Sequence, residues 1–165
     1  MNSAVPLLQR RALACTCTVA LLGFSIAGLT RGQDEVHTTR PRLYRVIVPV
    51  PDIDRGVAFY KELLGFEGET VGPGRYYFDC GGVILACFDP RADGDDFDAT
   101  PNPDHVYFAV KDLDAVFRRA RSLPCRKLDP QIKTQPWGER CFYATDPFGN
   151  PICFVDERTV FTGER

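Results

Sequence analysis

A short pattern occurs twice in this chain, and it constrains the fold more than any other feature. Residues 50–54 (VPDID) and 110–114 (VKDLD) each join the end of an apolar run to two aspartates separated by one residue. An aspartate there can accept hydrogen bonds from the free amides of a helix's first turn. Apolar residues then recur at helical spacing after both copies. Because neither unit can bury its apolar face alone, the repeat predicts two similar modules packed side by side.

Short β-prone runs follow each predicted helix. In the first module the helix begins at Ile53 and ends before Gly65, and strands are expected at residues 43–50, 66–71, 75–79 and 83–88. In the second module the helix covers residues 113–123, and strands are expected at residues 105–110, 126–133, 140–145 and 152–155. The predicted fold class is α+β, with two βαβββ modules pairing into a curved, partly open mixed sheet. The central cleft of such a sheet is the expected place for a ligand.

The two modules are joined by an acidic, turn-rich stretch, residues 89–103, which is interpreted as a solvated connector. Its aspartates lack the ligand spacing and the terminal glutamate of an EF-hand, so a calcium loop is not favoured. The whole chain has a formal charge of −2 and no basic stripe, which disfavours a nucleic-acid partner.

The first 32 residues differ in composition from the rest. They contain no Asp or Glu, and Arg10 and Arg11 precede an apolar run from Ala12 to Leu29. This order is typical of an export signal and predicts a periplasmic or extracellular protein. The alternatives are an uncleaved membrane anchor and an over-long start, in which case the protein is cytoplasmic. Residues 33–41 are expected to be a linker, residues 42–158 the domain (modules about 42–89 and 104–158), and residues 159–165 a tail.

Seven cysteines are present, two in the leader and five beyond it, and none forms a Cys-x-x-Cys pair. Scattered cysteines on apolar strands are usually small buried hydrophobes. Cys141 and Cys153 are expected to lie nearly opposite each other in a hairpin centred on Pro147 and Phe148. A cross-strand disulfide between them therefore stays open as an alternative in an exported chain.

Two motifs carry a family resemblance. One is the turn Asp146-Pro147-Phe148-Gly149-Asn150 between two apolar runs, and the other joins VPDID at residues 50–54 to Phe59-Tyr60 and Leu64-Gly65-Phe66. Over residues 42–158 the chain resembles the glyoxalase / bleomycin-resistance / dioxygenase superfamily, also called vicinal oxygen chelate (VOC) proteins. The resemblance implies the fold, but one scaffold hosts many reactions and also non-catalytic drug binding.

Metal-using members of that superfamily take ligands from the first and last strands of each module. The matching positions here are Arg45, Ala86 (or Leu85, if the register slips by one), His105 and Cys153. Only His105 is a conventional ligand, and an arginine stays protonated and repels a cation. We therefore expect no metal or other cofactor. A weakly bound divalent or soft metal held by His105 and Cys153 is the alternative.

The resemblance also implies which face lines the pocket, and strand parity extends the set of ligand-binding residues, because side chains two apart point to the same face. They are Arg45, Tyr107, Cys141, Tyr143 and Cys153, with His105 as a candidate acid–base group and Trp137 at the mouth of the cleft. These groups suit a small anionic or aromatic molecule. The alternatives are structural roles, in which His105 is a hydrogen-bonded core histidine and Arg45 forms an ion pair with a neighbouring acid.

Three functions therefore remain open. The first is a metal-independent small-molecule-binding protein, possible also as a homodimer. The second is a diverged lyase, isomerase or dioxygenase that uses His105 with Cys153 or with a weakly bound divalent metal, although the incomplete ligand set argues against metal-dependent glyoxalase or dioxygenase activity. The third is an interaction module whose edge strands pair with another chain.

Overall fold

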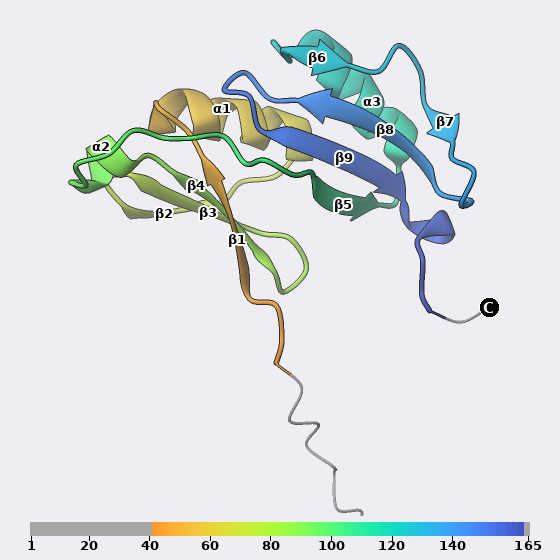
Figure 1. Ribbon diagram of the computed structural model, residues 1–165, viewed down its shortest axis with the longest axis horizontal. Coiled ribbons are helices and arrows are strands. Elements are labelled where there is room, and N and C mark those ends of the chain that lie inside the picture. Colours follow the sequence, from red (N-terminus) through yellow and green to blue (C-terminus); the bar gives the residue numbers. More distant parts are fainter. Residues whose placement is uncertain (1–40, 164–165) are drawn as a thin grey trace, which may run out of the picture. The chain divides into compact units, whose positions relative to one another are not determined.

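The computed structural model describes residues 41–163 (Figure 1). The predicted leader, all but the last residue of the predicted linker, and the end of the predicted tail lie outside the described residues. Within the described part, no helix has the length and apolar character needed to cross a membrane.

The first module forms a four-stranded mixed sheet with one covering helix. Its elements are β1 (Arg45–Pro49), α1 (Ile53–Leu64), β2 (Glu69–Gly72), β3 (Arg75–Asp79) and β4 (Ile84–Phe88). The strand order is β1-β4-β3-β2, with β1 and β4 parallel and the other pairs antiparallel. We call this the first sheet.

The second module repeats the plan. Its elements are β5 (Val106–Val110), α3 (Leu113–Ser122), β6 (Lys127–Leu128), β7 (Lys133–Thr134), β8 (Arg140–Thr145), β9 (Pro151–Asp156) and a 3-10 turn, η1 (Glu157–Thr159). The order is β5-β9-β8-β6, with β7 also paired to β8, and β5 and β9 are parallel. We call this the second sheet. The α+β class and the two βαβββ modules are thus confirmed, as two mixed sheets that do not close into a barrel.

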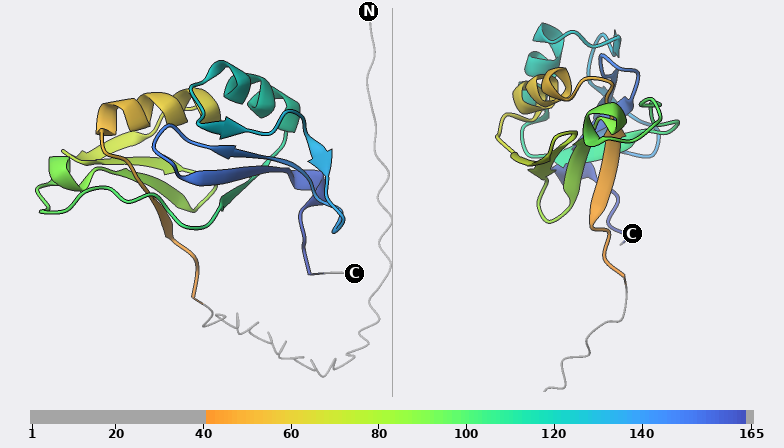
Figure 2. Two further views of the ribbon diagram at one scale, coloured as in Figure 1. Left: turned by 45° about the horizontal axis from the view of Figure 1, so that its top comes forward. Right: turned by 90° about the vertical axis from the view of Figure 1, so that its left-hand side faces the viewer.

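Both sheets carry their helix on the same side. Figure 2 shows α1 and α3 next to each other above the strands, and the two helices are in contact. One continuous core joins the modules, with members such as Tyr60 and Leu63 from α1, Val116 from α3, and Phe142 and Phe154 from the second sheet. The opposite side of each sheet, which we call its open face, is covered by no helix of residues 41–163 (Figure 2).

The repeated aspartates cap the helices as predicted. Asp52 accepts a hydrogen bond from the amide of Arg55 at 3.0 Å, and Asp112 accepts one from the amide of Ala115 at 2.8 Å. Gly65 ends α1 in the left-handed region, at φ 82°, which glycine adopts without steric cost. The equivalent caps explain why the two modules start their helices at the same point of the repeat.

Two expectations about the irregular segments need correction. The connector contains a short helix, α2 (Pro90–Asp93), and its aspartates pair with arginines: Asp93 with Arg75, and Asp96 and Asp98 with Arg91. The single strand expected at residues 126–133 is two separate two-residue strands, β6 and β7.

The turn between β8 and β9 forms a buried polar centre that joins the modules. One oxygen of Asp146 accepts hydrogen bonds from the amides of residues 148, 149 and 150 at 2.7–2.9 Å. The other accepts from the Tyr60 hydroxyl of α1 at 2.9 Å and from the Asn150 side chain at 2.7 Å. Asn150 also donates to the carbonyl of Pro49 on β1 at 2.9 Å. The motif that carries the family resemblance therefore fixes the fold, since buried polar groups are stable only when paired.

Candidate functional site

The register of the second sheet aligns three of the predicted site residues across three strands. Cys153 on β9 is directly opposite Tyr107 on β5 and Tyr143 on β8. Because paired residues share a face, all three belong to the open face, together with Cys141. The neighbouring positions Phe142 and Phe154 lie in the core beneath α3, as the alternation along a strand requires.

Three rings form a cluster on this open face. The imidazole of His105 lies 5.0 Å from the Tyr143 ring and 6.0 Å from the Tyr107 ring, and the two tyrosine rings meet edge to face at 6.4 Å. His105 is exposed, so it is not the satisfied core histidine of the alternative reading. Tyr107 is 57% exposed. The cluster therefore offers aromatic surface to a ligand from solvent.

Burial raises the pKa of two groups at this cluster, the Tyr143 hydroxyl and the Cys153 thiol. Loss of solvent, together with a hydrogen bond to Tyr107, raises the pKa of the Tyr143 hydroxyl well above its usual value. Burial also raises the pKa of the Cys153 thiol, with a further contribution from the neighbouring Cys141. A thiol held in its protonated form is a poor nucleophile and a poor metal ligand. The Cys153 part of the enzyme alternative therefore loses support.

Cys141 and Cys153 were expected nearly opposite each other, and the register places them diagonally. Cys141 is opposite Val155, and the partner of Cys153 is Tyr143, because the turn is centred on Phe148, half a residue beyond the expected centre. The two cysteines are diagonal neighbours in one buried cluster, and all five cysteines of the described region are free. The Gln135 side chain donates to the Cys141 sulfur at 3.4 Å.

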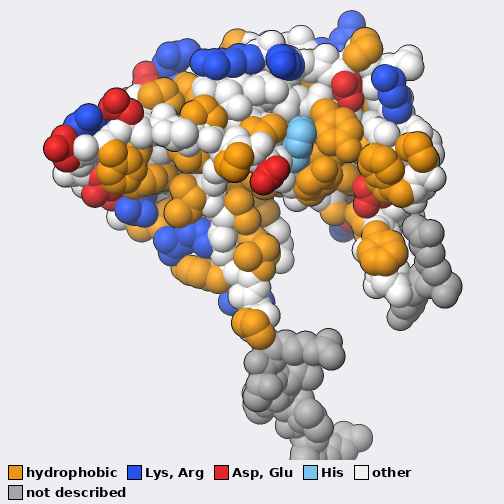
Figure 3. Space-filling view, in the orientation of Figure 1, with side chains coloured by type: hydrophobic (Ala, Val, Ile, Leu, Met, Phe, Trp, Pro, Cys, Tyr) orange, Lys and Arg blue, Asp and Glu red, His pale blue; other side chains and the backbone are white. Residues whose placement is uncertain are grey.

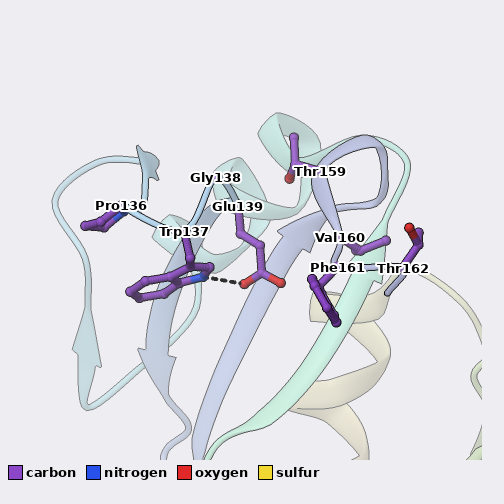
Figure 4. Close-up of a pocket in the computed structure, with 8 residues that line it drawn as sticks. All are labelled: Pro136, Trp137, Gly138, Glu139, Thr159, Val160, Phe161 and Thr162. Carbon is purple, nitrogen blue, oxygen red and sulfur yellow. Dashed lines mark hydrogen bonds between the residues drawn. The ribbon is translucent and has the colours of Figure 1, made fainter. Parts of the chain in front are cut away.

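Trp137 lies on the loop between β7 and β8, at the edge of the same face. It is 53% exposed, and its indole N–H donates to the Glu139 carboxylate at 2.8 Å (Figure 4). A cavity of about 470 Å³ is lined by Trp137, Tyr107, Val155, Val160 and Phe161 among others. Tyr107 and Trp137 thus line one cavity, as expected for a residue at the mouth of the site.

Two further cavities are lined by other residues of the predicted site. His105 and Tyr143 line a second cavity of about 510 Å³ with Lys127 and Asp129. Between the two sheets lies a smaller, mostly apolar cavity of about 260 Å³, whose walls come from both modules and include Tyr107. In the space-filling view, hydrophobic side chains lie on both flanks of an open hollow (Figure 3). Tyr107, Phe108 and Ala109 line both this cavity and the one beside Trp137, so β5 forms part of the wall of each.

Arg45 lies apart from this cluster, on β1 of the first sheet. Its guanidinium carbon is 4.9 Å from the Tyr44 ring centre and 4.6 Å from that of Tyr77, and its Nη2 donates to the Tyr44 hydroxyl at 3.1 Å. Its buried Nε has no hydrogen-bond partner, and no ion pair of Arg45 occurs within residues 41–163. The acid of the expected alternative is therefore not found among the described residues. The arginine is held by aromatic rings instead.

The four positions at which metal-using relatives carry ligands do not fit a divalent ion here. Ala86 pairs with Ile47 and so shares the open face with Arg45, which places it, rather than Leu85, at the expected position. Ala86 has no donor atom, Arg45 stays charged, and Cys153 is fully buried with a raised pKa. Among residues 41–163 no three His, Cys, Asp or Glu side chains are grouped for metal binding. The expected lack of a metal remains a prediction.

Sequence reasoning missed several residues around the candidate site. Glu139 shares strand parity with Cys141 and Tyr143, so the pattern that identified those two contained it. Val160 and Phe161 lie in the predicted tail, where no pattern indicated contact with the domain. Tyr77, which holds Arg45, reaches it across β4, and only the sheet register shows this.

Two βαβββ modules share one core beneath paired helices and are joined through a buried Asp-Pro-x-Gly-Asn turn. This arrangement places the chain in a class of two-module α+β proteins. A family model described as "Glyoxalase/Bleomycin resistance protein/Dioxygenase superfamily" matches residues 42–154. The chain belongs to this superfamily.

Solved structures show the same fold. A lactoylglutathione lyase from Agrobacterium tumefaciens is 23% identical, with a TM-score of 0.54, covering 72% of this chain and 95% of that one. TioX from Micromonospora sp. ML1 is 21% identical, with a TM-score of 0.55 and coverage of 71% and 99%. A glyoxalase/bleomycin resistance protein from Albidiferax ferrireducens T118 is 22% identical, with a TM-score of 0.58 and coverage of 68% and 95%. A comparison with curated protein sequences found no match.

Proposed function

We propose that this protein binds a small aromatic molecule on the open face of its second sheet, without using a metal. The observation that carries the proposal is the ring cluster of His105, Tyr107 and Tyr143, from which Tyr107 continues into the cavity beside Trp137. Edge-to-face and offset packing against such rings stabilises an aromatic guest beyond the area it buries.

Of the two ligand types expected from the sequence, the geometry supports the aromatic one better. The anionic alternative depended on Arg45 acting beside the phenols. Arg45 instead belongs to the first sheet and is enclosed by Tyr44 and Tyr77, while the rings of the cluster belong to the second sheet. The aromatic cluster needs no contribution from the arginine.

The enzyme alternative has weaker support. One form of it uses His105 with Cys153, but the thiol is fully buried and its raised pKa keeps it protonated near neutral pH. The other form uses a weakly bound divalent metal, but among residues 41–163 no three His, Cys, Asp or Glu side chains are grouped to hold one. The similarity to a lactoylglutathione lyase supports the shared fold, since fold alone does not specify a reaction.

The chain offers a direct test, because Trp137 is its single tryptophan. Indole fluorescence of the full-length protein therefore reports from the cavity itself. We expect saturable quenching or a spectral shift on titration with benzyl alcohol, phenylacetate or benzyltrimethylammonium, unchanged by a chelator. If none of the three aromatic probes gives a saturable change, the proposed function is wrong. If the chelator abolishes the change, the metal-free part is wrong.

A further inference from the structure

The cavity beside Trp137 has a carboxylate in an otherwise aromatic and apolar wall. Glu139 lines it together with Trp137, Tyr107 and Phe161. The same glutamate, tryptophan and phenylalanine also line an adjoining cavity of about 350 Å³ (Figure 4). In that view the carboxylate projects into the space between the indole and the Phe161 ring. Ring faces and a carboxylate both attract positive charge.

Among residues 41–163, no positive side chain lines either of these two cavities. Arg140 and Arg158 belong to the same hairpin region, but they pair with Asp156, and Arg140 also pairs with Asp114. Lys133 shares the open face with Cys141, yet it lines neither cavity. Within residues 41–163 Glu139 forms no ion pair, so its charge stays available to a ligand.

The groups are also held in place before any ligand arrives. The amide of Gln135 donates to the carbonyl of Glu139 at 2.8 Å, and the amide of Gly138 donates to the carbonyl of Gln135 at 2.9 Å. Gly138 adopts φ 100°, which suits glycine and closes the tight turn that carries Trp137. The indole N–H then fixes one carboxylate oxygen, at 2.8 Å. A preorganised site loses less free energy in ordering its side chains when it binds.

We propose that the ligand is an organic cation, an aromatic molecule that carries a protonated amine or a quaternary ammonium group. Its positive group lies among Trp137, Tyr107, Phe161 and the carboxylate of Glu139, and its ring packs toward the tyrosine cluster. The inference rests on the proposed function and specifies the ligand class for that site.

The test compares three benzyl probes that differ in charge: benzyltrimethylammonium, neutral benzyl alcohol and anionic phenylacetate. Their affinities for the full-length protein are measured by Trp137 fluorescence at low and high salt. We expect the cation to bind roughly tenfold more tightly than the other two at low salt, because cation–π and carboxylate attraction add to the contacts of the ring. The preference should shrink as salt screens the charge.

Variants separate the carboxylate from general surface charge. Glu139→Gln keeps the size of the side chain and should lower affinity for the cation several-fold, with little change for benzyl alcohol. Glu157→Gln removes an exposed glutamate that lines neither cavity and should change nothing. Equal affinities for all three probes, or equal behaviour of the two variants, would overturn the cation inference and leave aromatic binding intact. Absence of binding by every probe would overturn both.

Discussion

The last hairpin of this protein has two regions of opposite character. At its turn, Asp146 is fully buried and accepts five hydrogen bonds, which connect α1, the turn and, through Asn150, β1. On its open face, Tyr143 and the neighbouring Tyr107 present rings with few fixed polar contacts. One region has every polar group paired inside the protein, and the other leaves surface for a partner.

The difference shows that the motif that identifies the superfamily and the residues proposed to bind a ligand are different parts of the hairpin. The Asp-Pro-x-Gly-Asn turn identifies the superfamily because its geometry holds two modules together. The residues that we propose bind the ligand lie on alternating positions of the strands, where the superfamily's metal-ligand pattern is not kept. Substitutions in the turn should therefore lower the free energy of unfolding, whereas substitutions on the open face should lower the affinity for a ligand.

The largest effect is expected from Asp146→Ala. The substitution leaves five donors without their acceptor in a buried place and should lower the free energy of unfolding by about 3–5 kcal/mol. The matched control is Asp79→Ala, since Asp79 also accepts a turn amide, that of Gly82 at 2.7 Å, but in an exposed hairpin. Urea denaturation of the two variants makes the comparison. Equal losses would contradict the central role of the buried turn.

The next largest effect is the difference in stability lost on removing two tyrosine hydroxyls, those of Tyr60 and Tyr107. Burial and the contact with Asp146 raise the pKa of Tyr60, whose hydroxyl donates to that carboxylate. Tyr60→Phe should therefore cost about 1–2 kcal/mol of stability. Tyr107→Phe, at a half-exposed phenol, should cost less than about 0.5 kcal/mol. Thermal or chemical unfolding distinguishes them, and a costly Tyr107→Phe would mean that the open face also supports the fold.

A smaller effect should appear in binding. Tyr143→Leu removes the ring that contacts both His105 and Tyr107. The substitution should lower the affinity for an aromatic probe by about five- to tenfold. Arg45→Gln should leave affinity for neutral benzyl alcohol unchanged, because Arg45 belongs to the first sheet. Trp137 fluorescence measures both. A loss of affinity in Arg45→Gln would show that the two sheets share one site.

The smallest effect concerns acid stability at the far end of the hairpin. Hydrogen bonds from Arg158, aided by Arg140, hold the pKa of Asp156 well below its usual value. Because the folded-state pKa is the lower one, this stabilisation is present above the unfolded pKa of about 4 and is lost as pH falls through the folded-state value. Asp156→Asn should thus be less stable than the parent at pH 7, by a margin that narrows below about pH 4. A constant difference across that range in urea titrations would contradict this account.

Much of the fold follows from local signals that are short and chemically specific. Asp52 and Asp112 predict the start of their helices, because an aspartate before residues with helical apolar spacing is favoured as a helix cap. The helix α2 was missed although its signals were present: Asp89 caps it, accepting from the amide of Ala92, and Pro90 occupies its first turn. The surrounding acidic residues made the stretch resemble a simple connector.

The candidate site was less predictable, since it depends on register and on contacts distant in sequence. Parity placed Tyr107, Cys141, Tyr143 and Cys153 on one face, which the sheet register confirms. The exact cross-strand partner of Cys153 depended on the centre of a five-residue turn, and a shift of half a residue in that centre changes the pairing by one residue. Phe161 enters the cavity after the last strand has ended, where no periodic pattern exists to indicate it.

We propose that the open face of the second sheet holds an organic molecule without a metal. The most direct test titrates benzyltrimethylammonium against the full-length protein, before and after chelator treatment, while Trp137 fluorescence is followed and the metal content of the same sample is measured. We expect saturable binding that is identical in both samples and weaker in Tyr143→Leu. Stoichiometric metal whose removal abolishes binding would contradict it.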